Sequence, residues 1–145
     1  MKYDFAIGKI FREIKEIPQF TNYEEVQAAL LEPLNGVDFA VKELRNGDTV
    51  VLLFEKLHPL VNINKFEILD VLEITSINED DLICFQSCQK DSLRDSEIVA
   101  ITKYDENLEY FKDIIQAWRA DRENGKFISI DPKGIECLNE GFGAD

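Results

Sequence analysis

The chain has 145 residues, with 29 Asp and Glu against 16 Lys and Arg, which gives a net charge of −13 and a pI near 4.5. The excess is spread evenly, since residues 1–90 hold 16 acidic and 9 basic residues and residues 91–145 hold 13 and 7. An acidic surface repels nucleic acids and anionic lipids and attracts basic proteins at long range. The charge therefore excludes nucleic-acid and membrane binding and allows a basic protein partner.

Length and composition predict a single folded domain over residues 1–145, since 45% of the residues are hydrophobic. The longest uninterrupted apolar stretch is Val50–Phe54, which is too short for a signal peptide or a membrane-spanning segment. Cys84, Cys88 and Cys137 form an odd set with no regular spacing, which argues against a disulfide scaffold. We therefore expect a soluble cytoplasmic protein with reduced thiols.

The first predicted elements are a strand and a helix. Tyr3, Phe5 and Ile7 alternate with polar or small residues, which predicts a strand. The capping-box pattern at residues 21–25 predicts a helix that begins there and ends at Pro33.

The clearest turn signal follows at Asn46-Gly47, a pair that favours a tight β-hairpin turn. The alternating residues before it and the β-rich residues 49–57 after it predict the two strands of that hairpin. A helix over residues 37–44 is the competing interpretation. Further strands are predicted over residues 65–75, 82–87 and 98–101.

Residues 105–118 predict a second helix, because their apolar residues recur at spacings of three and one, as one stripe of an amphipathic helix would. The stripe consists of Leu108, Phe111, Ile114, Ile115 and Trp118. Asn124-Gly125 would end the helix, and residues 126–130 predict a last strand. This order predicts an α+β domain, with a mainly antiparallel sheet of about five or six strands and two helices packed on one face.

Four residues are candidates for binding a partner. Glu106, Glu109 and Asp113 would share one face of the predicted second helix and form a row of carboxylates for a basic surface. Phe142, near the end of the chain, would add an apolar anchor or instead hold the tail against the core. The alternative for the three acidic residues is an ordinary solvent-exposed helix face.

No catalytic, metal or cofactor motif is present in the sequence. His58 is the only histidine and is either a general base or a loop residue that follows a strand. The three cysteines and His58 lack the paired spacing of zinc sites, and the glycines lack the spacing of nucleotide-binding loops. The sequence therefore predicts no metal site and no cofactor.

These observations favour a non-enzymatic protein-binding module, a monomer or a homodimer. Its more specific form would be an acidic inhibitor or immunity-type protein that caps a basic partner such as a toxin. The alternative is a small enzyme or a small-ligand-binding protein with a pocket between sheet and helices. In that pocket His58, a carboxylate and either Tyr104 or Tyr110 would supply acid/base chemistry.

Overall fold

The computed structural model describes residues 2–59, 64–75 and 77–143. Contacts between residues divide the chain into two compact units. Unit 1 holds residues 1–76 and 122–127, and unit 2 holds residues 77–121 and 128–145. Each unit has a hydrophobic core of its own. The single domain over residues 1–145 stays a prediction.

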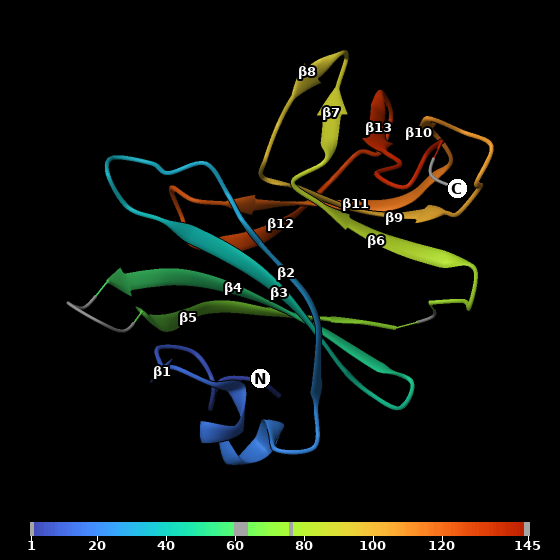
Figure 1. Ribbon diagram of the computed structural model, residues 1–145. Helices are drawn as coiled ribbons and strands as arrows, with labels where there is room; N and C mark the ends of the chain where they lie inside the picture. Colours follow the sequence, from blue (N-terminus) through green and yellow to red (C-terminus); the bar gives the residue numbers. More distant parts are fainter. Residues whose placement is uncertain (1, 60–63, 76, 144–145) are drawn as a thin grey trace. The chain divides into compact units, whose positions relative to one another are not determined.

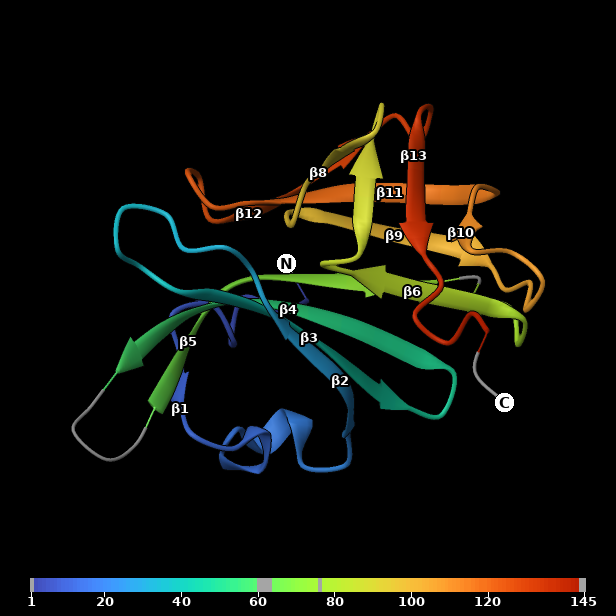
Figure 2. The same cartoon turned by 45° about the horizontal axis from the view of Figure 1, so that its top comes forward.

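Strands dominate both units (Figures 1 and 2). Two short 3₁₀ turns lie near the start of the chain, η1 (Ile14–Glu16) and η2 (Pro18–Phe20). The strands are β1 (Ile10–Phe11), β2 (Glu24–Leu30), β3 (Phe39–Asn46), β4 (Thr49–Pro59), β5 (Asn64–Ile74), β6 (Asp81–Phe85), β7 (Cys88–Lys90), β8 (Leu93–Arg94), β9 (Ile98–Lys103), β10 (Tyr110–Phe111), β11 (Ile114–Asp121), β12 (Lys126–Ile130) and β13 (Ile135–Leu138).

Unit 1 is built on one antiparallel sheet with the strand order β1-β5-β4-β3-β2. Strands β2 to β5 are neighbours in chain order, and β1 pairs with the outer side of β5. Most residues of the central strands β3 and β4 are buried. A strand buried on both faces has a continuous apolar sequence, which explains the run Val50–Phe54.

The β3–β4 hairpin confirms the strongest sequence signal. Asn46 pairs with Thr49 at the end of the ladder, so the connecting loop is Gly47-Asp48, one residue later than predicted. Gly47 has a φ of 60°, a left-handed conformation that glycine adopts without a Cβ clash. The competing helix over residues 37–44 is wrong. The predicted strands over residues 65–75, 82–87, 98–101 and 126–130 are confirmed as β5, β6, β9 and β12. Each end of these strands lies within two residues of its predicted position.

The N-terminal segment packs its apolar side chains on one face of the unit 1 sheet. This core joins Ala6, Phe11, Ile17 and Phe20 of the segment to Leu44, Val51, Leu53 and Ile68 of the sheet. The strand predicted at Tyr3, Phe5 and Ile7 is wrong, because consecutive turns occupy these residues and the Ala6 N–H donates to the Tyr3 carbonyl over 3.0 Å. The alternation instead reflects aromatic packing, with the Phe5 ring 5.5 Å from that of Phe20.

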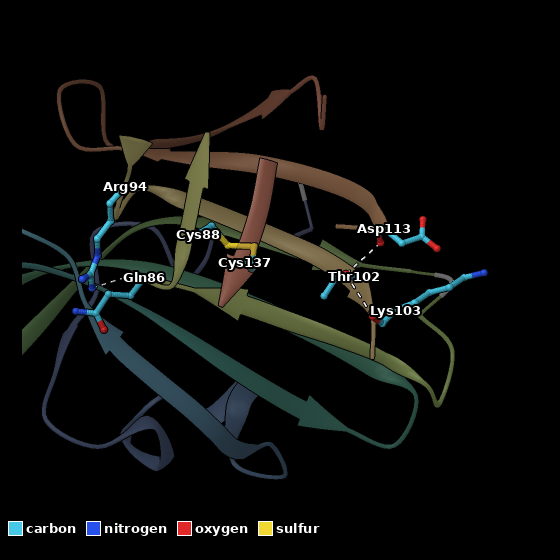
Figure 3. Close-up of a disulfide and its surroundings, with 7 residues drawn as sticks. All are labelled: Gln86, Cys88, Arg94, Thr102, Lys103, Asp113 and Cys137. Carbon is cyan, nitrogen blue, oxygen red and sulfur yellow. Dashed lines mark hydrogen bonds between the residues drawn. A yellow bond between two sulfur atoms is a disulfide. The ribbon is translucent and has the colours of Figure 1, made fainter. Parts of the chain in front are cut away.

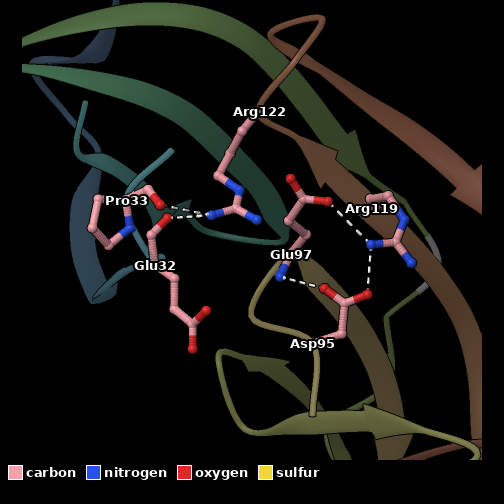
Figure 4. Close-up of polar contacts among 6 residues, drawn as sticks. All are labelled: Glu32, Pro33, Asp95, Glu97, Arg119 and Arg122. Atoms are coloured by element: carbon pink, nitrogen blue, oxygen red, sulfur yellow. Dashed lines mark hydrogen bonds and ion pairs between the residues drawn. The ribbon is translucent and has the colours of Figure 1, made fainter. Parts of the chain in front are cut away.

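Residues 122–127 belong to unit 1 although they lie late in the sequence. Arg122 donates hydrogen bonds to the backbone carbonyls of Glu32 and Pro33 (Figure 4). The Phe127 N–H donates to Asp70 Oδ2 over 2.8 Å, and its ring centroid lies 5.6 Å from that of Phe54. Side-chain and backbone contacts thus both attach this segment to the sheet.

Two antiparallel sheets, with the strand orders β12-β11-β9-β6 and β10-β13-β7-β8, make up unit 2, apart from the first two residues of β12, which belong to unit 1. In Figures 1 and 2, β7 and β13 run across the direction of β9 and β11. The core of the unit draws residues from both sheets: Cys84, Cys88, Ile98, Ala100, Phe111, Ala117, Ile135 and Cys137.

A charged cluster fastens β11 to the turn before β9. Arg119 Nη1 lies 2.6 Å from Asp95 Oδ2 and 3.0 Å from Glu97 Oε1 (Figure 4). The other oxygen of Asp95 accepts the Glu97 N–H over 3.1 Å. Asp95 and Glu97 therefore form ion pairs within unit 2, and their charges are offset by Arg119.

The predicted α+β fold is wrong: the described residues contain no α-helix, and the structure is mainly β with three antiparallel sheets. The first predicted helix is strand β2, which pairs with β3 from Glu24–Arg45 to Leu30–Ala40 with one bulge. Because Val26, Ala28 and Leu30 also alternate, this stretch fits the period of a strand as well as that of a short helix. In the structure, the backbone N–H and C=O groups of this stretch pair with those of β3, which stabilises the strand.

The second predicted helix is a loop followed by β10 and β11. Strand β11 pairs with β9 from Ile114–Thr102 to Arg119–Ile98, with an irregularity between Ile114 and Gln116. A bulge of this kind shifts the alternation by one residue, so Ile114, Ile115 and Trp118 fall at spacings that resemble a helix. Leu108 and Phe111 lie outside β11, in the loop and in β10. Asn124-Gly125 is a turn between β11 and β12, with a φ of 66° at Gly125.

No helix among the described residues is long and apolar enough to cross a membrane.

Candidate functional site

The loop at residues 104–109 and the turn at residues 139–142 lie side by side in unit 2, and one buried residue joins them (Figure 1). Asn139 is 6% exposed, and its side-chain amide donates to the Leu108 carbonyl over 2.9 Å. Its backbone N–H donates to the Glu109 carbonyl over 2.8 Å, and its own carbonyl accepts the Phe142 N–H over 3.0 Å. Asn139 therefore brings Glu109 and Phe142 to the same region.

The loop itself is also well fixed. The Asn107 N–H donates to Asp105 Oδ1 over 2.9 Å, and the Tyr104 N–H donates to the Asp80 carbonyl over 3.0 Å. The Tyr104 ring centroid lies 5.7 Å from that of buried Phe111 in β10. Glu106, between these anchors, is exposed.

Asp113 lies at the base of the same loop. Its backbone carbonyl accepts hydrogen bonds from Thr102 Oγ1 over 3.1 Å and from the Lys103 N–H over 3.4 Å, while the residue is exposed (Figure 3). The four predicted partner-binding residues thus belong to one part of unit 2, although not on a helix. The role assigned to them stays a prediction.

Large apolar side chains are exposed among these carboxylates. Phe142 is 47% exposed and Tyr104 is 53% exposed, and Leu108 and Leu138 are also exposed. We call this region the Asn139 surface; it consists of Tyr104, Glu106, Leu108, Glu109, Asp113, Leu138 and Phe142. Exposed apolar side chains with a polar rim mark many protein-binding sites. Sequence reasoning missed Asn139, whose isolated position in the sequence carries no recognisable pattern.

A disulfide joins Cys88 in β7 to Cys137 in β13 (Figure 3). The two cysteines are direct partners in the β7–β13 ladder, and both are fully buried. The prediction of reduced thiols is therefore wrong for this pair. Sequence spacing could not reveal it, because the two residues are 49 positions apart and meet only through strand pairing.

Cys84 is the free cysteine and is buried in the same core. Burial raises the pKa of its thiol to about 12. Since the thiolate is the form that binds metals and acts as a nucleophile, Cys84 is unsuited to either role at neutral pH. Among the described residues, no group of three or more His, Cys, Asp or Glu is placed to hold a metal ion.

His58 lies near the end of β4, opposite β5. Its Nε2 is 2.7 Å from Glu67 Oε1, and both side chains are about one-third exposed. The pair is therefore a partly solvent-exposed contact between the side chains of neighbouring strands. The described residues form no α-helix that could line the predicted pocket between sheet and helices. The alternative of a small enzyme or a small-ligand-binding protein stays a prediction. Tyr104 and Tyr110 belong to unit 2, whereas His58 belongs to unit 1.

The sheet of unit 1 holds a buried ion pair. Glu55 in β4 is fully buried, and among the residues that the structure describes neither of its carboxylate oxygens has a hydrogen-bond partner. Lys42 Nζ in β3 lies 3.3 Å from Glu55 Oε1, and the Lys42 side chain is 8% exposed. Burial raises the pKa of Glu55 to about 7, and the charge of Lys42 opposes that rise.

Aromatic rings complete the surroundings of Lys42. Its Nζ lies 3.4 Å from the centroid of the Phe66 ring and 5.0 Å from that of Phe11. The faces of aromatic rings attract cations. Glu25, 47% exposed, lies 3.8 Å from the same nitrogen. Sequence analysis missed this cluster; its signal was Glu55, a charged residue directly after the apolar run Val50–Phe54.

A cavity of about 510 Å³ opens beside Lys42. It is lined by Arg12, Glu13, Ile14, Lys15, Glu25, Ala28, Lys42 and Phe66. Two other cavities of unit 1, of about 450 and 250 Å³, lie along the N-terminal segment. His58 lines none of these three cavities.

The raised pKa of Glu55 gives a pH dependence of stability. Between the unfolded value near 4.5 and the folded value near 7, the folded chain binds the proton more tightly than the unfolded chain does. Stability therefore falls as pH rises through this range, and we expect a loss of roughly 3 kcal/mol between pH 4.5 and pH 8 from this group. Urea titrations of the wild type across this range measure it.

The Glu55→Gln variant is the control, because glutamine does not titrate and this part of the slope should vanish. A Glu25→Gln variant should retain most of the slope, because the charge of Glu25 is the smallest of the causes that shift the pKa of Glu55. Equal slopes in the wild type and Glu55→Gln would show that Glu55 does not titrate as described.

The chain matches no protein-family model, no curated protein and no solved structure among those compared.

Proposed function

We propose that the protein is a non-enzymatic binding module whose Asn139 surface recognises a basic protein. The observation that carries this proposal is the anchoring by Asn139, which holds exposed Phe142 beside the loop that carries Glu106 and Glu109. An interface needs a few apolar anchors for affinity and a complementary charge for rapid encounter. This surface offers both on a fixed backbone.

Charge supports a basic partner. Residues 104–113 contain four carboxylates and one lysine, within a chain whose net charge is −13. The lysine, Lys112, lies 3.9 Å from Glu136, which partly offsets its charge. The remaining carboxylates would attract a lysine- and arginine-rich surface over distances of about a Debye length, near 8 Å at physiological salt.

The proposal is limited to binding of a basic protein. It does not include the inhibitor or immunity-type role, because no family model or curated protein that matches the chain supports that role. The cytoplasmic location stays a prediction, and the Cys88–Cys137 disulfide argues against it because structural disulfides persist mainly in oxidising compartments.

Affinity capture from the lysate of the source organism tests the proposal, with the wild type and variants compared side by side. We expect a basic protein that binds at low salt and is weakened at high salt. Phe142→Ala should weaken its affinity at least about tenfold, as the loss of an interface anchor does. Glu106→Gln/Glu109→Gln should slow association and reduce the salt dependence.

The matched control is Glu24→Gln/Asp48→Asn, which removes two exposed carboxylates from unit 1. This variant should retain the partner with nearly unchanged affinity. Equal loss in both charge variants would indicate attraction by the overall charge and not by the Asn139 surface. Recovery of no protein by the wild type, or of an acidic protein, would contradict the proposal.

A further inference from the structure

The nearly buried ammonium of Lys42 is part of the lining of the cavity beside it. Lys42 is the only one of its three cationic lining residues whose side chain is nearly buried, and its ammonium is fixed by Glu55 on one side and the Phe66 ring on another. Because Phe11, Phe66 and Glu55 already hold this internal cation, the space is unsuited to a cationic ligand. The ammonium can instead attract an anion from the cavity.

One contact of Lys42 is weak and exchangeable. Glu25 lies 3.8 Å from the ammonium, beyond hydrogen-bond distance, and its side chain is 47% exposed. It also lines the cavity. The carboxylate of an incoming molecule can take the place of Glu25 opposite Lys42, while Glu55 stays buried behind it.

The rim and walls of the cavity indicate the rest of the ligand. Arg12 and Lys15 add positive charge to the lining, which Glu13 offsets in part, and Phe66, Ala28 and Ile14 supply apolar surface. The volume of about 510 Å³ falls within the range of small-molecule sites, about 300–1,000 Å³. A ligand that uses both properties is an organic anion with one carboxylate and an apolar body.

We propose that this cavity binds a small organic carboxylate, with its carboxylate on Lys42 and its apolar part against Phe66 and Ala28. The site belongs to unit 1 and is independent of the Asn139 surface, so either proposal can fail without the other.

Nuclear magnetic resonance titration of the wild type with benzoate tests the proposal. We expect saturable shifts at the methyl groups of Ala28 and Ile14, with a dissociation constant of about 1 mM or tighter. Benzyl alcohol, which lacks the charge, and inorganic phosphate, which lacks the apolar body, should each bind at least about tenfold more weakly. Benzyl alcohol binding as tightly as benzoate would overturn the role of Lys42, and phosphate doing so would overturn the role of the apolar wall.

Variants locate the site. Lys42→Met/Glu55→Leu replaces the ion pair with apolar side chains and should abolish benzoate binding while its spectrum stays that of a folded protein. Glu25→Gln removes the competing carboxylate and should tighten benzoate binding roughly two- to fivefold. The matched control Glu24→Gln, at the adjacent exposed position, should leave it unchanged. The absence of saturation up to roughly 20 mM benzoate in the wild type would overturn the proposal.

Discussion

Replacing Cys88 and Cys137 together with alanine is expected to lower the free energy of unfolding of unit 2 by about 4 kcal/mol. The disulfide closes a loop with a sequence separation of 49, and cross-linking a loop of that length removes about this much free energy from the unfolded chain in the chain-entropy account. The bond also joins β7 to β13 inside the core of the unit. Unit 2 should therefore depend strongly on its redox state.

A denaturant titration followed by tryptophan fluorescence measures this effect, because Trp118 is the single tryptophan and lies in unit 2. The matched control is Cys84→Ala, which removes a buried sulfur from the same core without breaking a cross-link. It should cost only about 1 kcal/mol, as the loss of one small buried group does. If a reducing agent leaves the wild-type transition unchanged, the disulfide does not stabilise unit 2.

Lys42→Met is expected to destabilise unit 1 by about 3–5 kcal/mol at pH 8. The variant leaves the carboxylate of Glu55 buried with no counter-ion, and removal of one partner of a buried ion pair costs about this amount. The loss should be smaller at pH 5, because the pKa of Glu55 is about 7 and its carboxyl group is then neutral. Urea titrations followed by circular dichroism at the two pH values measure both effects.

The double variant Lys42→Met/Glu55→Leu separates an unpaired charge from lost packing. Apolar residues of similar size often replace a buried ion pair at little or no cost, so the double variant should recover most of the stability lost at pH 8. If the single and double variants are equally unstable, the cost comes from packing around Lys42 and the ion-pair account is wrong.

The sequence predicted the β3–β4 hairpin and β5 correctly, whereas the two helices that it predicted are β2 and a loop followed by β10 and β11. The hairpin around Gly47 and the strand β5 carry β-branched residues, turn residues and clear lengths. Residues 24–30 are short enough to fit either period, and the bulge in β11 shifts its alternation toward helical spacing. In both places tertiary strand pairing overrides a local helix signal.

The sequence likewise predicted only part of the candidate site. Glu106, Glu109, Asp113 and Phe142 were selected on the sequence, but the predicted reason, one helix face, was wrong. What brings Glu109 and Phe142 together is the hydrogen bonding of Asn139, about 30 residues from the loop it anchors. The Cys88–Cys137 and Lys42–Glu55 pairs likewise depend on which strands are neighbours. Contacts of this kind require the sheet topology, which a single sequence does not state.

Zero-length carbodiimide cross-linking in the lysate of the source organism, followed by mass spectrometry, tests the central claim most directly. The reagent joins carboxylates to lysines that are in contact, so it reports the acidic surface and the basic partner together. We expect a basic protein linked through Glu106, Glu109 or Asp113, and weaker linkage at high salt. Links that fall mainly on the carboxylates of unit 1, or no link to any protein, would contradict the claim that the Asn139 surface binds a basic partner.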